Sequence, residues 1–287
     1  NKPIIGFIGQ GFVGENMAND FEERGFSTIR YSLEPEYVGN KDKVKEADIV
    51  FIAVPTPTTP QGFDFSILRA QAKLVGKGKT LVIKSTVLPG TTEVLQKDNP
   101  EIFILHSPEF LVAATAKEDA KKPERNLIGI PIDNDDFRQR AEEVLTILPK
   151  APYTKVLLSK ETELIKYIGN NFLYTKVIFM NLMYNLAEKI GADWPKVAEA
   201  VSNDSRIGKS HMMPVHTSER STGRGAGGHC FPKDFEALLQ FYRDNITDEE
   251  GLKVLEAIRN KNIELLTKSN KDADILAGIY NVGNAKK

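Results

Sequence analysis

The chain has 287 residues, 41% of them hydrophobic and 27% charged, with a formal net charge of -1 at pH 7. A chain of this length can form two hydrophobic cores, so two domains are expected. The balanced charge offers no basic surface for nucleic acid, which is not expected as a partner. No apolar run approaches the roughly 20 residues that span a bilayer, and residues 1–6 lack the features of a secretory signal. We therefore expect a cytoplasmic protein with no membrane partner.

The first half of the chain alternates short apolar runs with amphipathic helical patterns. The strand-like runs are Ile4–Ile8, Ile49–Val54, Thr80–Ile83 and Ile102–Leu105, followed by Leu127–Ile130 and Val156–Leu158 on either side of a helical pattern at Phe137–Leu148. This rhythm predicts a doubly wound α/β domain with a parallel sheet over residues 1–158.

The second half, residues 159–287, predicts a helical domain built on one long helix. From Lys160 to Ile190 the pattern is helical without proline, which corresponds to a rod of roughly 45 Å. Pro195 marks the start of the next helix, and helical patterns continue to about Ser269. The run Ile275–Tyr280 suggests one further strand.

The long helix carries apolar side chains on much of its circumference. They are Leu164, Ile168, Phe172, Val177, Ile178, Phe179, Leu182 and Leu186. Helices that are hydrophobic nearly all round are usually buried nearly all round. This pattern predicts a homodimer joined along the helix, although packing within one chain would also satisfy it.

A glycine pattern directly follows the first apolar run. The segment IIGFIGQGFVGENMA places Gly9, Gly11 and Gly14 in GxGxxG spacing between a strand and a helix. Gly9 permits the tight turn, Gly11 lets the backbone approach a pyrophosphate, and Gly14 lets helix and strand pack closely. The pattern predicts a Rossmann-type dinucleotide site that includes Phe12 and Val13 at the helix N-terminus.

The end of the second strand bears on the choice of cofactor. An acidic residue is expected there to bind the ribose of NAD, but this sequence has Ser32. Glu34 could reach the ribose instead, whereas Arg30 and Ser32 together could accommodate the 2′-phosphate of NADP. We predict NAD and leave NADP open.

The single cysteine stands in a glycine-rich segment, GRGAGGHCFPKDFEAL. Lone cysteines are either inert and buried or reactive. Here the glycines, including Gly227, would let a substrate carbon approach the sulfur of Cys230, and Lys233 with a possible helix start would favour the thiolate. The segment resembles the GFGGSCFPKD signature of the UDP-glucose/GDP-mannose dehydrogenase family, which implies that Cys230 is the nucleophile and that Asp234 assists it.

Lys166 and Asn170 lie four residues apart on the long helix and so share a face. An ammonium and a carboxamide can hold a substrate hydroxyl and stabilise the oxyanion that forms as hydride leaves. The pair resembles the catalytic, substrate-binding lysine and asparagine of UDP-glucose dehydrogenases, and equally those of the β-hydroxyacid dehydrogenases.

Two strand-end segments resemble the sugar dehydrogenases further. The segment VFIAVPTP implies that Val54, Pro55 and Thr56 lie along the cofactor. The segment VIKSTVLPGT places Ser85 and Thr86 at the end of the fourth strand, where open parallel sheets bind ligands. The resemblance makes Thr86 the counterpart of a threonine that orients an active-site water.

Two other segments imply substrate contacts. HSPEFL matches the family's SPEFL, so Glu109 corresponds to a carboxylate implicated in thioester hydrolysis, and Phe110 and Leu111 accompany it at the substrate. In DSRIG, Arg206 corresponds to an arginine that reaches the partner subunit's substrate site. The resemblance also places Gly227 at the substrate.

The resemblance has departures. The stretch Leu33–Asp48 is shorter than in the family, and Ala113 stands where a second glutamate is common. The family ends in a third domain that binds the nucleotide, of which Ile275–Tyr280 could be only the first strand. The chain is then naturally short, truncated or completed by another polypeptide.

These features together predict NAD-dependent oxidation of the primary alcohol of a sugar or nucleotide sugar to a carboxylate. Two hydride transfers and a thioester on Cys230 are expected, without a metal. The alternatives are a single oxidation, as in β-hydroxyacid dehydrogenases, and an idle NAD-binding partner subunit.

Overall fold

The computed structural model describes residues 2–111, 115–218 and 221–280. Ala113 lies outside these residues. The chain forms two compact units: Asn1–Pro57 with Asp64–Lys166, and Thr58–Phe63 with Tyr167–Lys287. Each unit has its own buried core.

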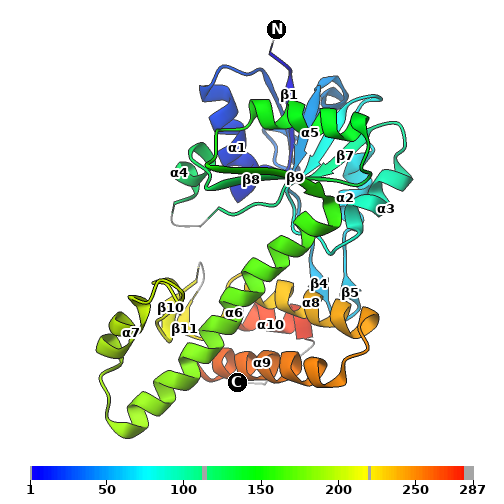
Figure 1. The fold of residues 1–287 in the computed structure, drawn as a ribbon. Helices are drawn as coiled ribbons and strands as arrows, with labels where there is room; N and C mark the ends of the chain where they lie inside the picture. Colours follow the sequence, from blue (N-terminus) through cyan, green and yellow to red (C-terminus); the bar gives the residue numbers. More distant parts are fainter. Residues whose placement is uncertain (1, 112–114, 219–220, 281–287) are drawn as a thin grey trace. The chain divides into compact units, whose positions relative to one another are not determined.

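The first unit is an α/β domain built on a seven-stranded sheet with the order β2-β1-β3-β6-β7-β8-β9 (Figure 1). Its elements are β1 (Ile5–Ile8), α1 (Phe12–Glu23), β2 (Thr28–Tyr31), the 3₁₀ helix η1 (Val38–Glu46), β3 (Ile49–Ile52), α2 (Ser66–Ala72), β6 (Thr80–Ile83), α3 (Thr91–Asp98), β7 (Phe103–His106), α4 (Ala116–Lys121), β8 (Arg125–Ile130), α5 (Asp135–Ile147) and β9 (Tyr153–Leu158). The strands predicted from the apolar runs are confirmed. One pairing departs from a wholly parallel sheet, because β7 and β8 run antiparallel and meet at His106 and Gly129.

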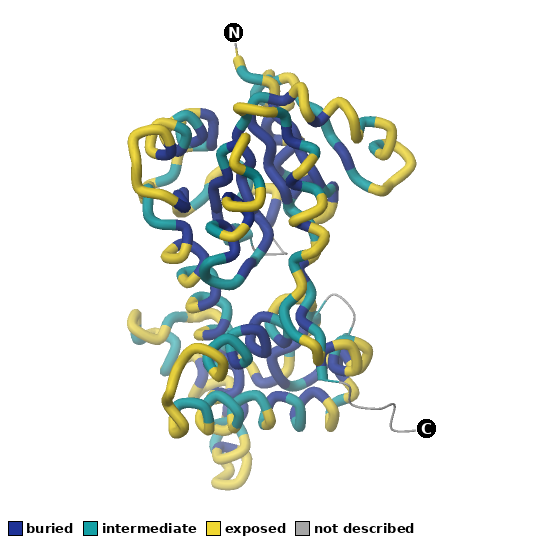
Figure 2. The backbone as a smooth tube through the Cα atoms, turned by 90° about the vertical axis from the view of Figure 1, so that its right-hand side faces the viewer, coloured by how far each residue is buried: buried dark blue, intermediate teal, exposed yellow. Residues whose placement is uncertain are grey.

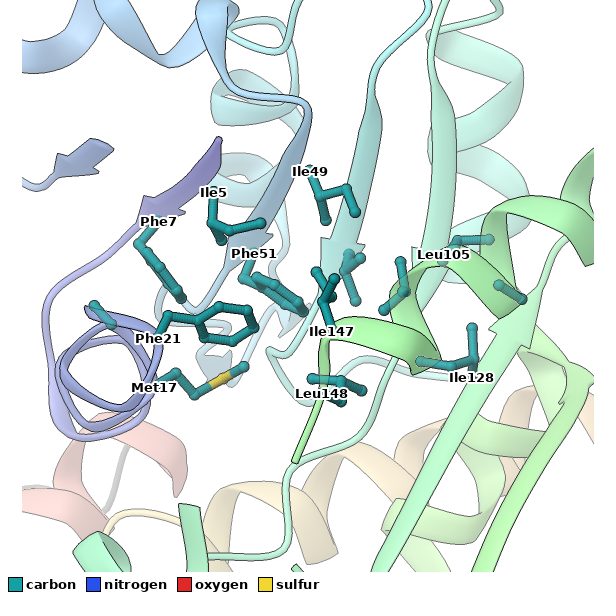
Figure 3. Packing of buried hydrophobic residues seen from close by; sticks show 14 of the residues in the cluster. Ile5, Phe7, Met17, Phe21, Ile49, Phe51, Leu105, Ile128, Ile147 and Leu148 are labelled. Carbon is teal, nitrogen blue, oxygen red and sulfur yellow. The ribbon is translucent and has the colours of Figure 1, made fainter. Parts of the chain in front are cut away.

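Hydrophobic burial explains why the central strands read as continuous apolar runs. Every residue of β1, β3 and β6 is buried, and Figure 2 shows dark blue backbone through the interior of this unit. On one face, Phe21 of α1 packs against Phe7 and Phe51, with ring centroids 5.6 and 5.5 Å apart, and α5 adds Ile147 to the same core (Figure 3). In a strand that is covered on both faces, every side chain is buried, so its sequence does not alternate between apolar and polar residues.

The second unit is mainly helical. Its helices are the greater part of α6 (Ser159–Ile190), α7 (Trp194–Ser202), α8 (Phe231–Asn245), α9 (Glu249–Lys268) and α10 (Ala273–Tyr280). The second unit also contains two short antiparallel hairpins. One pairs β4 (Thr58–Thr59) with β5 (Gly62–Phe63), and the other pairs β10 (Val215–Thr217) with β11 (Thr222–Arg224). The long helix and the helix start at Pro195 are confirmed. In the core, Tyr174 of α6 stacks on Phe235 of α8 with ring centroids 4.1 Å apart.

The expected strand at Ile275–Tyr280 is wrong, because these residues belong to α10. Leu276 and Ile279 are the buried residues of α10, and their spacing of three places them on one helical face. Short apolar runs fit a buried strand and a buried helix equally well, so periodicity alone could not distinguish the two.

The glycine turn has the geometry expected of a dinucleotide site. Gly9 has φ +90°, in the left-handed region, and a Cβ there would lie 2.1 Å from the Ala53 carbonyl oxygen. A Cβ on Gly14 would lie 1.9 Å from the Gly9 carbonyl oxygen, whereas one on Gly11 would meet no atom within 4 Å. Gly9 and Gly14 are thus required by the fold, and the backbone at Gly11 is left open.

We predict that Gly14→Ala lowers the free energy of unfolding by about 1–3 kcal/mol, because the turn must shift to admit the methyl group. Gly11→Ala is the matched control and should change stability by less than about 1 kcal/mol. It should instead weaken dinucleotide binding, because its methyl group would occupy the approach to the pyrophosphate. Denaturant unfolding and cofactor titration measure the two effects, and equal stability losses in both variants would contradict the assignment.

Candidate active site

Cys230 lies at the start of α8, where it is the N-cap residue and is exposed. The possible helix start is therefore confirmed, and the alternative of a buried thiol is wrong. Pro232 occupies the first turn, where its missing N–H costs nothing. The N-terminus of a helix stabilises nearby negative charge, which favours a thiolate at this position.

A buried carboxylate lies one turn into the same helix. Asp234 is 1% exposed. Its Oδ2 accepts a hydrogen bond of 2.7 Å from Asn170 Nδ2 of α6, and its Oδ1 accepts one from Lys233. Its backbone N–H donates to the Cys230 carbonyl. The structure thus brings together three predicted residues, Cys230, Asp234 and Asn170.

A second group lies in the first unit, around Glu109. Glu109 Oε1 accepts hydrogen bonds from the backbone N–H groups of Phe110 at 2.7 Å and Leu111 at 3.0 Å. Its Oε2 lies 3.2 Å from Nζ of Lys84, whose side chain is 7% exposed. Lys84 also donates to Ser107 and to the Pro108 carbonyl. These bonds hold the carboxylate of Glu109 in one orientation.

Sequence reasoning missed Lys84 as a partner of Glu109. A signal was present, because this lysine directly follows the fully buried strand β6 in VIKSTVLPGT. Buried lysines are almost always paired, so a lysine at that place indicated a nearby carboxylate.

Lys166 belongs to the same unit as Glu109 and Lys84. Its Nζ lies 5.6 Å from the ring centroid of Phe110, and the guanidinium carbon of Arg125 lies 3.7 Å from that centroid. A cavity of about 170 Å³ is lined in part by Lys84, Glu109, Phe110 and Arg125. Three cationic side chains, Lys84, Lys122 and Arg125, and three carboxylates, Glu109, Asp119 and Glu124, are among its lining residues, which suits a polar ligand.

His106 lies behind this group and is fully buried. Its Nδ1 is 2.8 Å from the Thr162 hydroxyl. Burial, and then the positive charge of Lys84, lower the pKa of His106 to about 3. The imidazole is therefore neutral at physiological pH and acts as a packing and hydrogen-bonding group.

The predicted cofactor loops after β3 and β6 are tied to each other. Ser85 Oγ donates to the Val54 carbonyl at 2.8 Å and accepts from the Val54 N–H at 2.9 Å. Thr56 Oγ1 donates to the Thr86 carbonyl at 2.7 Å. Within the described chain there is no hydrogen bond between the side chains of Thr86 and Glu109. The strands β1, β3 and β6 are neighbours, so their carboxyl ends, with Pro55 and the glycine turn, lie along one edge of the sheet.

The residues expected to discriminate between NAD and NADP have partners of their own. Arg30 donates to Glu22 at 2.9 and 2.6 Å and to Asn19 at 2.8 Å. Burial alone would raise the pKa of Glu22, but hydrogen bonds from Thr28 and Arg30 lower it, so Glu22 stays anionic. Arg30 is thus neutralised by α1.

Ser32 accepts a hydrogen bond from the backbone N–H of Glu34 at 3.2 Å, and its hydroxyl lies 3.4 Å from Glu34 Oε2. The carboxylate of Glu34 therefore lies beside the end of β2.

Two residues of the second unit that were predicted to bind substrate, Arg206 and Gly227, contact other protein groups in the structure. The side chain of Arg206 is 87% exposed and forms an ion pair with Asp204 at 2.6 Å. A Cβ on Gly227 would lie 2.2 Å from Asp272 Oδ2, so this glycine faces protein atoms.

In the part of the chain that the structure describes, no helix combines the length and the apolar character needed to cross a bilayer.

Comparison with known proteins gives one family. Residues 36–148 match the model of the NAD binding domain of the UDP-glucose/GDP-mannose dehydrogenase family, and residues 160–264 match the central domain of that family. A UDP-glucose 6-dehydrogenase from Rhizobium meliloti is 37% identical over 224 residues, which are 72% of this chain and 48% of that protein. The chain spans about half the length of the curated relatives it matches.

Solved structures agree with this result. A UDP-glucose dehydrogenase from Pyrobaculum islandicum is 28% identical with a TM-score of 0.77, and the match covers 91% of this chain and 68% of that one. A 3-hydroxyisobutyrate dehydrogenase from Mycobacterium tuberculosis has a TM-score of 0.70 over 99% of this chain and 100% of that one, but at 15% identity it shows likeness of fold alone. The chain belongs to the UDP-glucose/GDP-mannose dehydrogenase family, of which it carries the NAD-binding and central domains.

Proposed function

We propose that the protein oxidises the primary alcohol of a sugar or nucleotide sugar to a carboxylate, with NAD as the oxidant and a thioester on Cys230. The observation that carries the proposal is the exposed cysteine at the start of α8, one helical turn before the buried Asp234, whose carboxylate is hydrogen-bonded to Asn170. A silent cysteine needs neither exposure nor a helix N-terminus. A cytoplasmic location belongs to the proposal, because the thiol must remain reduced.

The glycine turn fits NAD, because the backbone at Gly11 is open where a pyrophosphate approaches and the helix α1 begins there. Phe12 and Val13 would present their N–H groups to the phosphates, and Val54, Pro55, Thr56 and Ser85 would line the same edge of the sheet. A NAD molecule bound there would accept the first hydride, and a second NAD molecule, taking the place of the reduced cofactor, would accept the second.

The protein groups have distinct roles in this scheme. In the first oxidation the substrate hydroxyl loses its proton to a base, for which Lys166, Asp234 and an ordered water are the candidates. The thiolate of Cys230 then adds to the aldehyde carbon, and the resulting oxyanion is stabilised by Lys166 and Asn170. After the second oxidation the carbon is held to sulfur as a thioester.

Hydrolysis completes the sequence. A water oriented by Thr86 and Glu109 adds to the thioester carbon, the carbon–sulfur bond breaks, and the carboxylate leaves as the thiol is restored. Lys84 and two backbone N–H groups hold Glu109 for this step. Phe110, Leu111 and Gly227 belong to the substrate site in this proposal.

A single oxidation is the second candidate. The pair Lys166 and Asn170, which equally resembles that of the β-hydroxyacid dehydrogenases, would serve such a reaction, and no thiol would be needed. Stoichiometry separates the candidates: two reduced cofactors per substrate for the thioester route, one for a single oxidation, and none for an idle partner subunit.

The test begins with a screen of nucleotide sugars, sugar phosphates and hydroxy acids, with UDP-glucose as the first probe. We predict two reduced NAD molecules per carboxylate formed by the unaltered protein. Cys230→Ala should form no carboxylate and bind NAD with unchanged affinity, because the thiol acts only after the cofactor has bound. Carboxylate production by a folded Cys230→Ala variant would remove the thioester from the mechanism.

The cofactor preference follows from charge. The charge of Arg30 is compensated by Glu22. The carboxylate of Glu34, beside Ser32 at the end of β2, would repel the 2′-phosphate of NADP. We predict that NAD binds at least about tenfold more tightly than NADP, a difference of 1.4 kcal/mol. Glu34→Ala should reduce the difference and Arg30→Ala should not. Tighter binding of NADP that is lost in Arg30→Ala would reverse the assignment.

We further propose a homodimer joined along α6. Of the eight apolar residues named on the circumference of this helix, Val177 and Ile178 are buried in the core of the second unit. The other six are exposed, among them Phe172 at 64% and Ile168 at 57%. Packing within one chain therefore accounts for two of the eight, and a second copy would cover the rest.

Mixing two inactive variants tests the dimer. If Arg206 serves the partner's site, heterodimers of Cys230→Ala and Arg206→Ala chains contain one intact site, and random exchange should restore about a quarter of the turnover. The matched control mixes Cys230→Ala with Asp234→Ala, because both residues lie on α8 of one chain and no site is restored. A monomer in sedimentation, or no recovery after proven exchange, contradicts the proposal.

A further inference from the structure

The segment between α9 and α10, residues 269–272, holds the loop that carries the cysteine. We define the cysteine loop as Thr222–Cys230. Ser269 Oγ accepts a hydrogen bond from the Arg224 N–H at 3.0 Å, and Lys271 Nζ donates to the Gly225 carbonyl at 3.1 Å. Lys271 is fully buried, so its contacts are with protein atoms.

Asp272 holds the end of the loop nearest the cysteine. Its Oδ2 accepts a hydrogen bond of 2.7 Å from the backbone N–H of Gly228, two residues before Cys230. Its Oδ1 accepts from the hydroxyls of Ser218 at 2.9 Å and Ser221 at 2.8 Å. Burial alone would raise the pKa of Asp272, but the hydrogen bonds from Gly228 and the serines lower it, so the acceptor remains a carboxylate.

The loop glycines fit this segment closely. A Cβ on Gly227 would lie 2.2 Å from Asp272 Oδ2, and one on Gly223 would lie 2.7 Å from Ser269 Oγ. Because these positions have no side chains, residues 269–272 can pack directly against the backbone of the cysteine loop. This reason differs from the one expected from the sequence, which was room for substrate near the sulfur.

The neighbouring helices hold the cysteine loop and the segment 269–272. Asn262 of α9 bonds both the N–H and the carbonyl of Ala226, at 2.7 and 2.9 Å. On the other side, α10 begins directly after Asp272 and buries Leu276 and Ile279. A glycine-rich loop loses much conformational entropy when it is ordered, and these bonds offset that loss.

We propose that Asp272 is a positioning residue, which orders the cysteine loop through Gly228 and thereby sets the orientation and reactivity of Cys230. The inference rests on the nucleophilic role of Cys230 proposed above. If the carboxylate is removed, Gly228 loses its acceptor and the residues before α8 are free to move. Cys230 would then spend less time at the helix N-terminus that favours its thiolate.

The test uses the single cysteine of the chain. Alkylation by iodoacetamide, followed by intact mass against pH, reports on Cys230 alone and needs neither substrate nor cofactor. In the full chain we expect Asp272→Ala to raise the pH midpoint of alkylation by about one unit. The turnover number should fall, with NAD affinity unchanged. Asp272→Asn keeps the size of the side chain but only one of the two acceptor oxygens, so it should shift the midpoint in the same direction by a smaller amount, which provides a readout if the alanine variant does not fold.

Asp248 provides the matched control. It lies in the same unit and accepts hydrogen bonds from the Gly251 N–H at 2.9 Å and from Tyr242 Oη at 2.6 Å. Asp248→Ala removes bonds of the same kind at the start of α9 and should lower stability without moving the alkylation midpoint. An unchanged midpoint in folded Asp272 variants, or an equal shift in Asp248→Ala, overturns the inference. A shifted midpoint in a protein whose Cys230→Ala variant still forms carboxylate would instead overturn the proposed thioester alone.

Discussion

The buried carboxylate of Asp234 is the constraint on which the site in the second unit depends. A charge with 1% exposure is costly to bury unless it is paired and hydrogen-bonded. Asp234 meets this condition through Asn170 of α6 and Lys233 of its own helix. Loss of either partner would leave part of the carboxylate unsatisfied, so the start of α8 has one favourable position against α6. The location of Cys230 follows, because it precedes Asp234 by one helical turn.

The first unit solves the same problem with an ion pair. Lys84 follows a fully buried strand and would be too costly to bury alone, and Glu109 lies in a loop that has little structure of its own. The carboxylate of Glu109 compensates the charge of the buried Lys84, and the ammonium group of Lys84 holds the loop that carries Glu109 in place. His106 lies behind this pair, and burial first and the positive charge of Lys84 second lower the pKa of its imidazole and keep it neutral.

Local patterns in the sequence were sufficient for the strands, the long helix and the glycine turn, and the resemblance to the family singled out Cys230, Asp234 and Asn170, which the structure brings together. They could not reveal bonds between distant residues, such as Lys84 with Glu109 or Asp272 with Gly228, because neither partner alters the periodicity around the other. The error at Ile275–Tyr280 has a related cause. The run is apolar in either conformation, and the choice of helix depends on burial of Leu276 and Ile279.

The glycines illustrate why a motif must be interpreted through what surrounds it. Gly14 and Gly227 have no room for a Cβ because backbone or side-chain oxygens lie about 2 Å from where it would be. Gly228 has open space but φ +77°, so its backbone conformation explains the residue. Gly11 has φ -79° and nothing within 4 Å of a Cβ, so neither packing nor conformation requires glycine there. Of these four positions, Gly11 is the one at which the folded chain leaves room for a Cβ in an ordinary backbone conformation, and it lies at the start of α1, where we propose that the pyrophosphate is held.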